Sequence, residues 1–347
     1  MKICIIGAGW FGCYLGLKLR EEGHQVKIFE KTNDVFSNSS GNNQNRLHLG
    51  FHYPRSQKTI NISKKGFKEF KKEFSFLTKK VKNNIYAIST SKSSKVNFKK
   101  YFSILKNSKL KFKKIDLKKT TSYNFKNLEN NISCGEEVIL NDKAKIYFKK
   151  KLKNIINFNK EIKNIKKQKN KFEIKNEKFD IVINCSGLQF LPSPIKNITH
   201  EYCCIFLYKQ ISKKQHPALT IMDGPFFTLY PWDDSKNYGL YSVNHSRLAK
   251  NKDFNKLKKL SNSKINKKYL QNIAKKVESK FSYYYPDFNK NFKFSKFLLS
   301  YRVISKNKQD SRICKIVNNK GYISVLPGKI DHIFYAYSKI KKCLNKY

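Results

Sequence analysis

The chain has 347 residues and carries 73 Lys and Arg against 24 Asp and Glu, a formal charge of +49. Its 39% hydrophobic and 14% aromatic content is enough for a packed core, which excludes an intrinsically disordered polyelectrolyte. No apolar run reaches the roughly 18–20 residues of a membrane span, so no transmembrane segment is predicted. This length favours one large unit or two intertwined domains.

The positive charge does not by itself indicate a nucleic-acid ligand. Six of the 73 basic residues are Arg, which leaves 67 Lys. Specific nucleic-acid sites rely on Arg for bidentate contacts. The Lys residues are instead spread with Asn and Ile along the whole chain, as an AT-rich gene would produce. We expect no specific nucleic-acid partner, and a Lys-rich protein that binds polyanions or membrane surfaces is kept as an alternative.

The eight Cys residues indicate a reducing compartment. They lie mostly in apolar contexts, contain no CxxC pair and show no regular spacing. Buried reduced thiols fit this pattern, and a zinc site would need a different ligand spacing. We therefore predict a cytoplasmic protein without a bound metal.

The N-terminus contains a strand, a helix and a second strand in close succession. Residues 2–6 (KICII) are a β-branched apolar run, typical of a buried parallel strand. A helical pattern follows and ends at Gly23. Residues 25–29 (QVKIF) predict the second strand, and the acidic residue Glu30 follows it. This order predicts an α/β fold with a Rossmann-like domain.

A Gly-x-Gly-x-x-Gly motif joins the first strand to the helix. Gly7 permits the tight turn, Gly9 lets the backbone approach a pyrophosphate, and Gly12 lets the helix pack closely on the strand. The helix N-terminus then offers free N–H groups to phosphates. Glu30 can accept hydrogen bonds from a ribose diol, which favours NAD or FAD over NADP. A signal peptide, the alternative for this stretch, would leave the acid-ended second strand unexplained.

Residues 39–56 (SSGNNQNRLHLGFHYPRS) form a polar segment after the second strand. Ligands bind near the carboxyl ends of the strands in open α/β sheets, so we expect this segment to contact one. The candidate contact residues are Ser40, Asn43, Gln44, Arg46, His48, His52, Tyr53 and Arg55. A solvated loop with ordinary surface histidines is the alternative.

Residues 2–31 followed by residues 39–56 resemble the FAD-dependent oxidoreductases of the D-amino-acid oxidase (DAO) superfamily. The resemblance implies FAD as the cofactor, with the glycine motif at the pyrophosphate and Glu30 at the adenosine ribose. It places four further residues beside the diphosphate and isoalloxazine: Ser40, Asn43, Gln44 and Arg46. It also implies that His48 lies nearest the flavin ring.

Two later segments continue the resemblance. Residues 179–187 (FDIVINCSG) look like the strand that returns to the FAD, with Gly187 close to the cofactor. Residues 321–344 contain a strand, Gly328 and an amphipathic helix whose N-terminus suits the flavin N1–C2=O edge. This ending is poorer in glycine than is usual for the superfamily and is somewhat similar to that of UDP-galactopyranose mutase, a redox-neutral flavoenzyme. The reaction type is therefore left open.

The rest of the chain predicts a second domain interleaved with the first. The expected FAD-binding domain comprises residues 1–80, 143–187 and 311–347. The expected substrate domain, an α+β unit built on an antiparallel sheet, comprises residues 81–142 and 188–310. Residues 57–76 predict a helix, because Phe67, Phe70 and Phe74 recur at spacings of three and four.

Arg residues are informative in a chain where Lys is so abundant, because they mark positions where Lys does not suffice. Arg55 falls in the polar segment, and Arg302 and Arg312 lie just before the C-terminal flavin segment. A guanidinium group there could form two parallel hydrogen bonds with a carboxylate or phosphate, so we expect a small anionic substrate. A structural ion pair with Asp310 or Asp331 is the alternative.

These observations predict an FAD-dependent oxidoreductase that oxidises a small amine, amino-acid or hydroxy substrate by hydride transfer to the flavin. The predicted catalytic residues are His48, His52 and Arg302, and the predicted substrate-binding residues are Tyr53, Arg55 and Arg312. A redox-neutral flavoenzyme that acts on a nucleotide sugar is the first alternative. The Lys-rich polyanion binder is the second.

Overall fold

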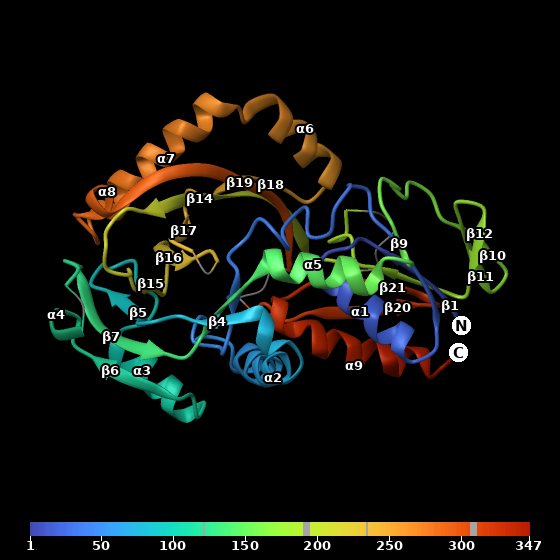
Figure 1. The fold of residues 1–347 in the computed structure, drawn as a ribbon, viewed down its shortest axis with the longest axis horizontal. Coiled ribbons are helices and arrows are strands. Elements are labelled where there is room, and N and C mark those ends of the chain that lie inside the picture. The colour runs from blue at the N-terminus through green and yellow to red at the C-terminus, as the bar shows by residue number, and fades with distance from the viewer. Residues whose placement is uncertain (121, 190–194, 234, 306–310) are drawn as a thin grey trace.

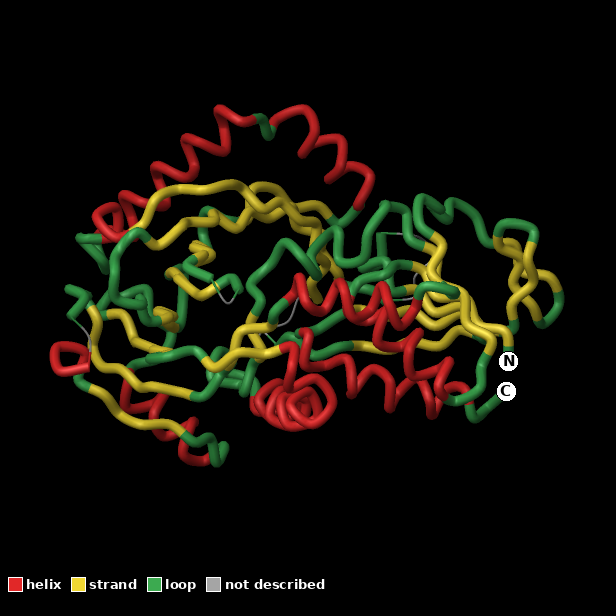
Figure 2. The backbone as a smooth tube through the Cα atoms, viewed as in Figure 1, coloured by secondary structure: helices red, strands yellow, loops and turns green. Residues whose placement is uncertain are grey.

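The computed structural model describes residues 1–120, 122–189, 195–233, 235–305 and 311–347. Two large sheets lie side by side, and helices cover their outer faces (Figure 1). Both chain termini lie at the same end of the molecule, beside the six-stranded sheet (Figure 2). The predicted α/β fold, with a parallel and an antiparallel sheet, is confirmed.

The six-stranded sheet has the predicted N-terminal strands near its centre. Its order is β20-β21-β13-β1-β2-β9, and the strands are parallel except in the edge pair β20–β21. The strands are β1 (Lys2–Ile6), β2 (Gln25–Phe29), β9 (Ile156–Asn157), β13 (Ile181–Asn184), β20 (Lys315–Asn319) and β21 (Tyr322–Leu326). The strand predicted over residues 179–187 is shorter than expected, because Phe179 ends the preceding antiparallel strand.

Helices pack on one face of this sheet, and a three-stranded meander covers the other. The helices are α1 (Trp10–Glu21), α2 (Gln57–Phe74), α5 (Asn141–Leu152) and α9 (Ile333–Leu344), and the meander is β10 (Lys166–Gln168), β11 (Lys171–Ile174) and β12 (Glu177–Phe179). Apolar side chains of the helices form one core with Ile3 and Ile5 of β1. On the opposite face, Phe172 and Phe179 pack against Cys4.

The two predicted helices next to the site are present with small differences in their ends. The helix predicted over residues 57–76 is α2, followed by the 3-10 turn η1 (Ser75–Leu77). The α-helix after Gly328 begins later than expected, because the 3-10 turn η2 (Ile330–His332) precedes α9. Residue Ser56 caps α2 by accepting a hydrogen bond from the Thr59 N–H at 3.4 Å.

The nine-stranded sheet has the order β18-β14-β17-β16-β15-β5-β7-β6, and β19 also pairs with β14. Within the described residues the pair β5–β15 is parallel, and the other pairs are antiparallel. Its strands are β5 (Asn84–Ser89), β6 (Phe112–Ile115), β7 (Leu128–Cys134), β14 (Ile198–Gln210), β15 (Ala218–Met222), β16 (Phe227–Pro231), β17 (Asn237–Ser242), β18 (Arg247–Asn251) and β19 (Phe292–Ser305).

Several helices of this half of the molecule were not expected from the sequence. They are α3 (Phe98–Asn107), α4 (Leu117–Thr120), α6 (Phe254–Lys264), α7 (Lys267–Ser282) and α8 (Phe288–Asn291). Helix α7 buries Leu270, Ala274, Val277 and Phe281 at spacings of three and four against the outer face of the sheet (Figure 1). The helical period was therefore present in the sequence, between exposed Lys residues.

A small fourth sheet joins strands from the segments predicted for the two domains. It has the order β3-β8-β4, with β3 (Arg46–Leu47), β8 (Glu137–Ile139) and β4 (Thr78–Lys80). Strand β3 belongs to the polar segment, so this sheet fixes where that segment enters the interior. In the described part of the chain, no helix combines the length and the apolar character needed to cross a membrane.

Candidate active site

A cavity of about 640 Å³ lies between the two large sheets. Its walls come from the six-stranded sheet, the polar segment and the nine-stranded sheet, and they include every residue predicted for the site except Gly12. The structure thus brings together segments that are up to about 320 residues apart, from Gly7 to Gly328. Among the described residues, no group of three or more His, Cys, Asp or Glu is arranged to hold a metal ion.

The glycine motif forms a cradle in which side chains would not fit. Gly7 has φ +98°, and a Cβ atom there would lie 3.0 Å from the Cys185 carbonyl oxygen. A Cβ atom at Gly12 would lie 1.9 Å from the Gly7 carbonyl oxygen, which explains why Gly12 supports the cradle without lining the cavity. A Cβ atom at Gly9 would lie 2.8 Å from the Ser40 hydroxyl oxygen. The close approach of Ser40 therefore requires that residue 9 has no Cβ atom.

Glu30 and Ser40 accept hydrogen bonds from backbone N–H groups on either side of Gly9. The Glu30 carboxylate accepts hydrogen bonds from the Ala8 N–H at 2.7 Å and from the N–H and hydroxyl of Thr32 at 3.0 and 2.9 Å. The Ser40 hydroxyl accepts a hydrogen bond from the Trp10 N–H at 3.0 Å, at the start of α1. Both groups line the cavity next to the helix N-terminus, where a ribose and a diphosphate would be expected.

Two Asn residues that the sequence did not single out bind the nine-stranded sheet: Asn38, directly before the polar segment, and Asn42 within it. The Asn38 amide accepts a hydrogen bond from the Tyr301 N–H at 2.8 Å and donates one to the Tyr301 carbonyl at 3.0 Å. Asn42 donates to the Leu299 carbonyl at 3.0 Å. These contacts fix the segment to β19, the strand that carries Arg302.

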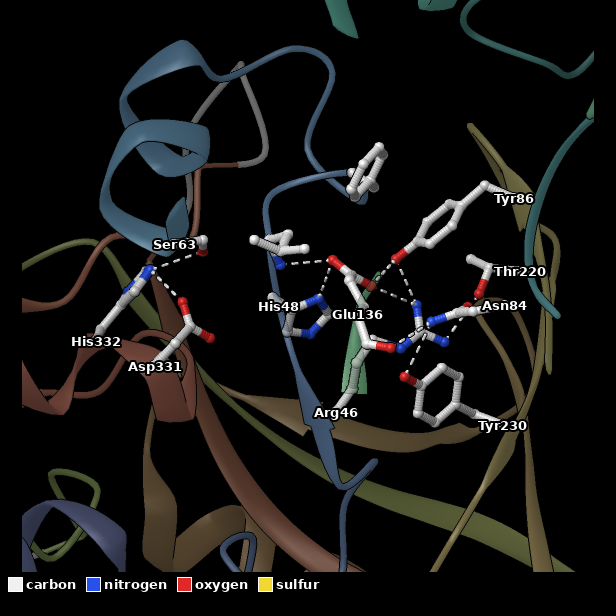
Figure 3. Close-up of polar contacts among 12 residues, drawn as sticks. Arg46, His48, Ser63, Asn84, Tyr86, Glu136, Thr220, Tyr230, Asp331 and His332 are labelled. Carbon is white, nitrogen blue, oxygen red and sulfur yellow. Dashed lines mark hydrogen bonds and ion pairs between the residues drawn. The ribbon is translucent and has the colours of Figure 1, made fainter. Parts of the chain in front are cut away.

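Arg46 lines the cavity, and its guanidinium group is bound there by protein groups. It donates to the Tyr86 hydroxyl at 2.6 Å and to the Thr220 hydroxyl at 2.8 Å, and it stacks on the Tyr230 ring with 3.9 Å between the guanidinium carbon and the ring centroid (Figure 3). Its Nη1 atom lies 3.7 Å from Glu136 Oε2, and neither side chain is exposed. Arg46 thus belongs to a buried network of protein groups, while its Nε atom has no hydrogen-bond partner among the described residues.

His48 and His52 lie together in the cavity, with 6.0 Å between their ring centroids. Burial, followed by the charge of Lys329, lowers the pKa of His48 to about 4 and that of His52 well below its ordinary value. Both rings are therefore neutral at neutral pH and can accept a proton. The Tyr53 ring lies 5.3 Å from that of His52 and also lines the cavity.

The Arg residues of the cavity are engaged with acidic side chains other than those expected. Arg302 donates to Glu201 at 2.8 Å and to the Tyr241 hydroxyl at 2.9 Å. Within the described residues its ion pair is with Glu201; Asp331 lies beside His332, and Asp310 falls outside the described residues. Arg55 pairs with Asp223 at 2.6 Å. The remaining predicted residue, Arg312, also lines the cavity.

Lys329 is a cavity residue that the sequence analysis missed. Its ammonium nitrogen lies 5.2 Å from the centroid of the Tyr53 ring, and no carboxylate of the described residues lies within ion-pair distance of it. Burial lowers its pKa to about 7, and the charges of Arg312 and Arg302 contribute. Because the chain contains 67 Lys residues, the presence of a Lys at one position does not by itself indicate a functional role. The available signal was its place directly after Gly328.

Gly328 and Gly187 allow close approach of the backbone at two further walls of the cavity. A Cβ atom at Gly328 would lie 2.2 Å from His332 Nδ1 and 2.4 Å from the Arg312 carbonyl oxygen. Gly187 has φ +70°, in the left-handed region. Both glycines line the cavity.

The cavity fits FAD by two structural criteria. First, Gly7 and Gly9 line the cavity beside the N-terminus of α1, a position that favours a phosphate group. Second, Gln44 Nε2 and His52 Nδ1 line the cavity but are buried without a hydrogen-bond partner among the described residues. Buried polar atoms are normally satisfied, so these two indicate that a polar ligand completes the site.

Comparison with known sequences leads to the same cofactor. Residues 2–82 match the DAO family, described as FAD dependent oxidoreductase. The chain is 28% identical over 336 residues to the FAD-dependent monooxygenase FPY4 of Fusarium mangiferae, covering 97% of this chain and 89% of that protein. It is 25% identical over 371 residues to the FAD-dependent monooxygenase kojA of Aspergillus flavus, covering 99% and 86%.

Solved structures share the fold over nearly the whole chain. An FAD-bound L-α-glycerophosphate oxidase from Mycoplasma pneumoniae has a TM-score of 0.74 at 16% identity, covering 99% of this chain and 94% of that one. A glycine oxidase from Geobacillus kaustophilus has a TM-score of 0.68 at 10% identity, covering 96% and 91%. Together with the glycine motif and the cavity, these similarities show a chain that resembles the FAD-dependent oxidoreductases of the DAO family and uses FAD as its cofactor.

Proposed function

We propose that the chain oxidises a small anionic substrate that carries an amine or hydroxyl group. The observation that supports this most is that one cavity holds both the glycine cradle and a group of neutral histidines beside cationic side chains. FAD, when bound, supplies the hydride-accepting chemistry. The protein residues then have three tasks: they hold the cofactor, orient the substrate and accept a proton.

The residues proposed to hold FAD come from the cradle and the polar segment. Gly7 and Gly9 leave the backbone of the turn open, and the first turn of α1 offers N–H groups to the diphosphate. Glu30 is proposed to accept hydrogen bonds from the ribose. The remaining proposed contacts are Ser40, Asn43, Gln44, Gly187 and Gly328, all of which line the cavity.

The substrate is proposed to bind between the histidines and the basic residues. Lys329 and Arg312 would attract its carboxylate or phosphate, with Tyr53 and Arg55 as further walls. His48 or His52 would accept the proton of the hydroxyl or ammonium group, since both rings are neutral. Arg302 is proposed to orient this region through its fixed contacts with Glu201 and Tyr241.

The decisive experiment is anaerobic mixing of the purified, FAD-loaded protein with a panel of amines, amino acids and hydroxy acids. We expect the visible flavin spectrum to bleach with at least one anionic member of the panel. An FAD-loaded protein that no member bleaches, but that interconverts a nucleotide sugar after dithionite reduction, would establish the redox-neutral alternative. Protein that cannot be loaded with FAD would contradict both.

A second candidate is supported by the whole-chain relatives, which are named FAD-dependent monooxygenases. In that case one oxygen atom from O₂ would enter the product. Mass spectrometry of products formed under ¹⁸O₂ separates this candidate from the oxidase, because an oxidase transfers both oxygen atoms to peroxide.

The role of Lys329 predicts how ligand binding depends on pH. With a pKa of about 7, its ammonium is charged below pH 7 and neutral above it. The dissociation constant of a small carboxylate ligand should therefore rise about tenfold between roughly pH 6 and pH 8, as expected for one titrating group. Changes in flavin absorbance on titration would measure it.

The variant Lys329→Met should bind the carboxylate weakly at both pH values. Lys95→Met is the matched control, because Lys95 also lines the cavity. It should keep the rise in the dissociation constant with pH. A wild-type dissociation constant that does not change over this range would exclude Lys329 as the anion-binding cation.

Three broader predictions remain proposals. We propose the division into an FAD-binding and a substrate domain, which is supported because each large sheet draws its strands from the segments predicted for one domain. A cytoplasmic location is supported by the eight free cysteines. The absence of a specific nucleic-acid partner is supported by the small share of Arg among the basic residues.

A further inference from the structure

Glu136 is a buried carboxylate that the proposed chemistry does not yet use. It lies between β7 and β8, and 1% of its surface is exposed. Oε2 accepts a hydrogen bond from the Tyr86 hydroxyl at 2.5 Å, and Oε1 accepts one from the Leu49 N–H at 2.8 Å. Burial of a charge is unfavourable unless partners compensate it, so this carboxylate is held in place by its surroundings.

The oxygen atom Oε1 also faces the ring of His48. It lies 3.6 Å from His48 Nδ1, which has no hydrogen-bond partner among the described residues (Figure 3). Leu49, whose N–H binds the same oxygen, is the next residue along the chain. The hydrogen bond from the Leu49 N–H thus holds the Glu136 carboxylate next to Nδ1 of the His48 ring.

The carboxylate is in turn fixed by the Arg46 network. Tyr86 accepts a hydrogen bond from Arg46 at 2.6 Å and donates one to Glu136, so its hydroxyl links the two charges. Arg46 is anchored at its other end by Thr220. Strands of two sheets meet in this network, and two of its members, Arg46 and His48, line the cavity.

A negative charge beside one nitrogen of a neutral imidazole selects the tautomer that carries its proton there. We propose that Glu136 is a positioning residue that keeps the His48 proton on Nδ1 and leaves Nε2 as the proton acceptor in the cavity. This inference rests on the proposed proton transfer to His48. The other charged or titratable groups near His48 are Lys329, Arg46, His52, Tyr53 and His332, and none of them carries a negative charge as a carboxylate does.

The direct test is ¹⁵N NMR of the FAD-loaded protein labelled at histidine. The spectrum of His48→Asn assigns the His48 signals, and two-bond ring couplings report the tautomer. We expect the Nδ1–H form in the wild type and a mixture or the Nε2–H form in Glu136→Gln. An Nε2–H form in the wild type, or an unchanged tautomer in Glu136→Gln, would overturn the proposal.

Two further variants separate positioning from general support of the fold. Tyr86→Phe removes the hydroxyl between Arg46 and Glu136 but leaves the carboxylate beside His48, so the tautomer should be retained. Glu136→Asp keeps the buried charge but withdraws it from the ring, so both tautomers should be populated even if Glu136→Gln does not fold. A loss of the Nδ1–H form in Tyr86→Phe equal to that in Glu136→Gln would contradict the proposal.

A double-mutant cycle of Glu136 and His48 tests the same positioning role through the rate of flavin reduction. Glu136→Gln should slow flavin reduction by about 100-fold or more, the lower range for a positioned acid–base group. The same change in the His48→Asn background should have little further effect. Equal losses in both backgrounds would show that Glu136 does not act through His48. If no substrate reduces the flavin, the proposed function fails, while the NMR experiment still decides the role of Glu136.

Discussion

Replacing Gly12 with Ala should abolish FAD binding and destabilise the folded protein. The new Cβ atom would lie 1.9 Å from the Gly7 carbonyl oxygen, a backbone atom that cannot rotate away. Ala normally favours a helix by up to about 1 kcal/mol over Gly, but overpacking at a rigid contact costs roughly 1–3 kcal/mol or more. The clash therefore outweighs the helix propensity, and it displaces the turn that contains Gly7 and Gly9.

The measurement is the flavin content of the purified variant together with its urea unfolding curve. Gly135→Ala is the matched control, because the nearest atom to its new Cβ would be Leu49 Cδ1 at 3.9 Å. This control should keep both FAD and stability. A Gly12→Ala protein with full flavin content would show that α1 does not need its close approach to β1.

Replacing Arg46 with Leu should cost about 3–5 kcal/mol of folding free energy, the range for removing one partner of a buried ion pair. Both Arg46 and Glu136 have fully buried side chains, so the remaining carboxylate cannot be solvated. Arg46→Lys should recover only part of this loss, because a single ammonium cannot bridge Tyr86 and Thr220 while stacking on Tyr230. Urea unfolding of the FAD-free proteins measures all three free energies.

The double variant Arg46→Leu with Glu136→Leu should be more stable than Arg46→Leu alone, because it removes the unpaired charge. If it is less stable, the cost arises from lost packing of Arg46 instead of from the buried carboxylate.

The same pair also predicts a dependence of stability on pH. Burial alone would raise the pKa of Glu136, but His48, Arg46 and Tyr86 together hold it at about 2, below the ordinary value of 4.5. A carboxyl group with a lowered folded-state pKa stabilises the protein above its ordinary pKa, and this stability is lost as the pH falls toward about 2. In Arg46→Leu the loss of stability between about pH 4.5 and pH 2 should be smaller, because one of the groups that lowers the pKa of Glu136 is absent.

The sequence by itself determined the strand–turn–helix–strand unit that carries the glycine motif. A glycine motif between a buried strand and a helix, followed by an acid-ended strand, has one common structural solution, because each glycine meets a local steric requirement. Gly7, Gly9, Gly12 and Glu30 lie where that solution places them. The polar segment was recognisable for a similar reason, since so many ligand-binding side chains in a short stretch are unusual for a solvated loop.

Only the tertiary structure decided which side chains of that segment face the cavity. Arg46 and His48 both line the cavity, and Arg46 is also bound there by Tyr86 and Thr220 from two other strands. Their common partner, Glu136, is about 90 residues away in the chain, and the partner of Arg302 is Glu201 on the adjacent strand. Such pairs depend on strand register across two sheets, and no local pattern of residues contains that information.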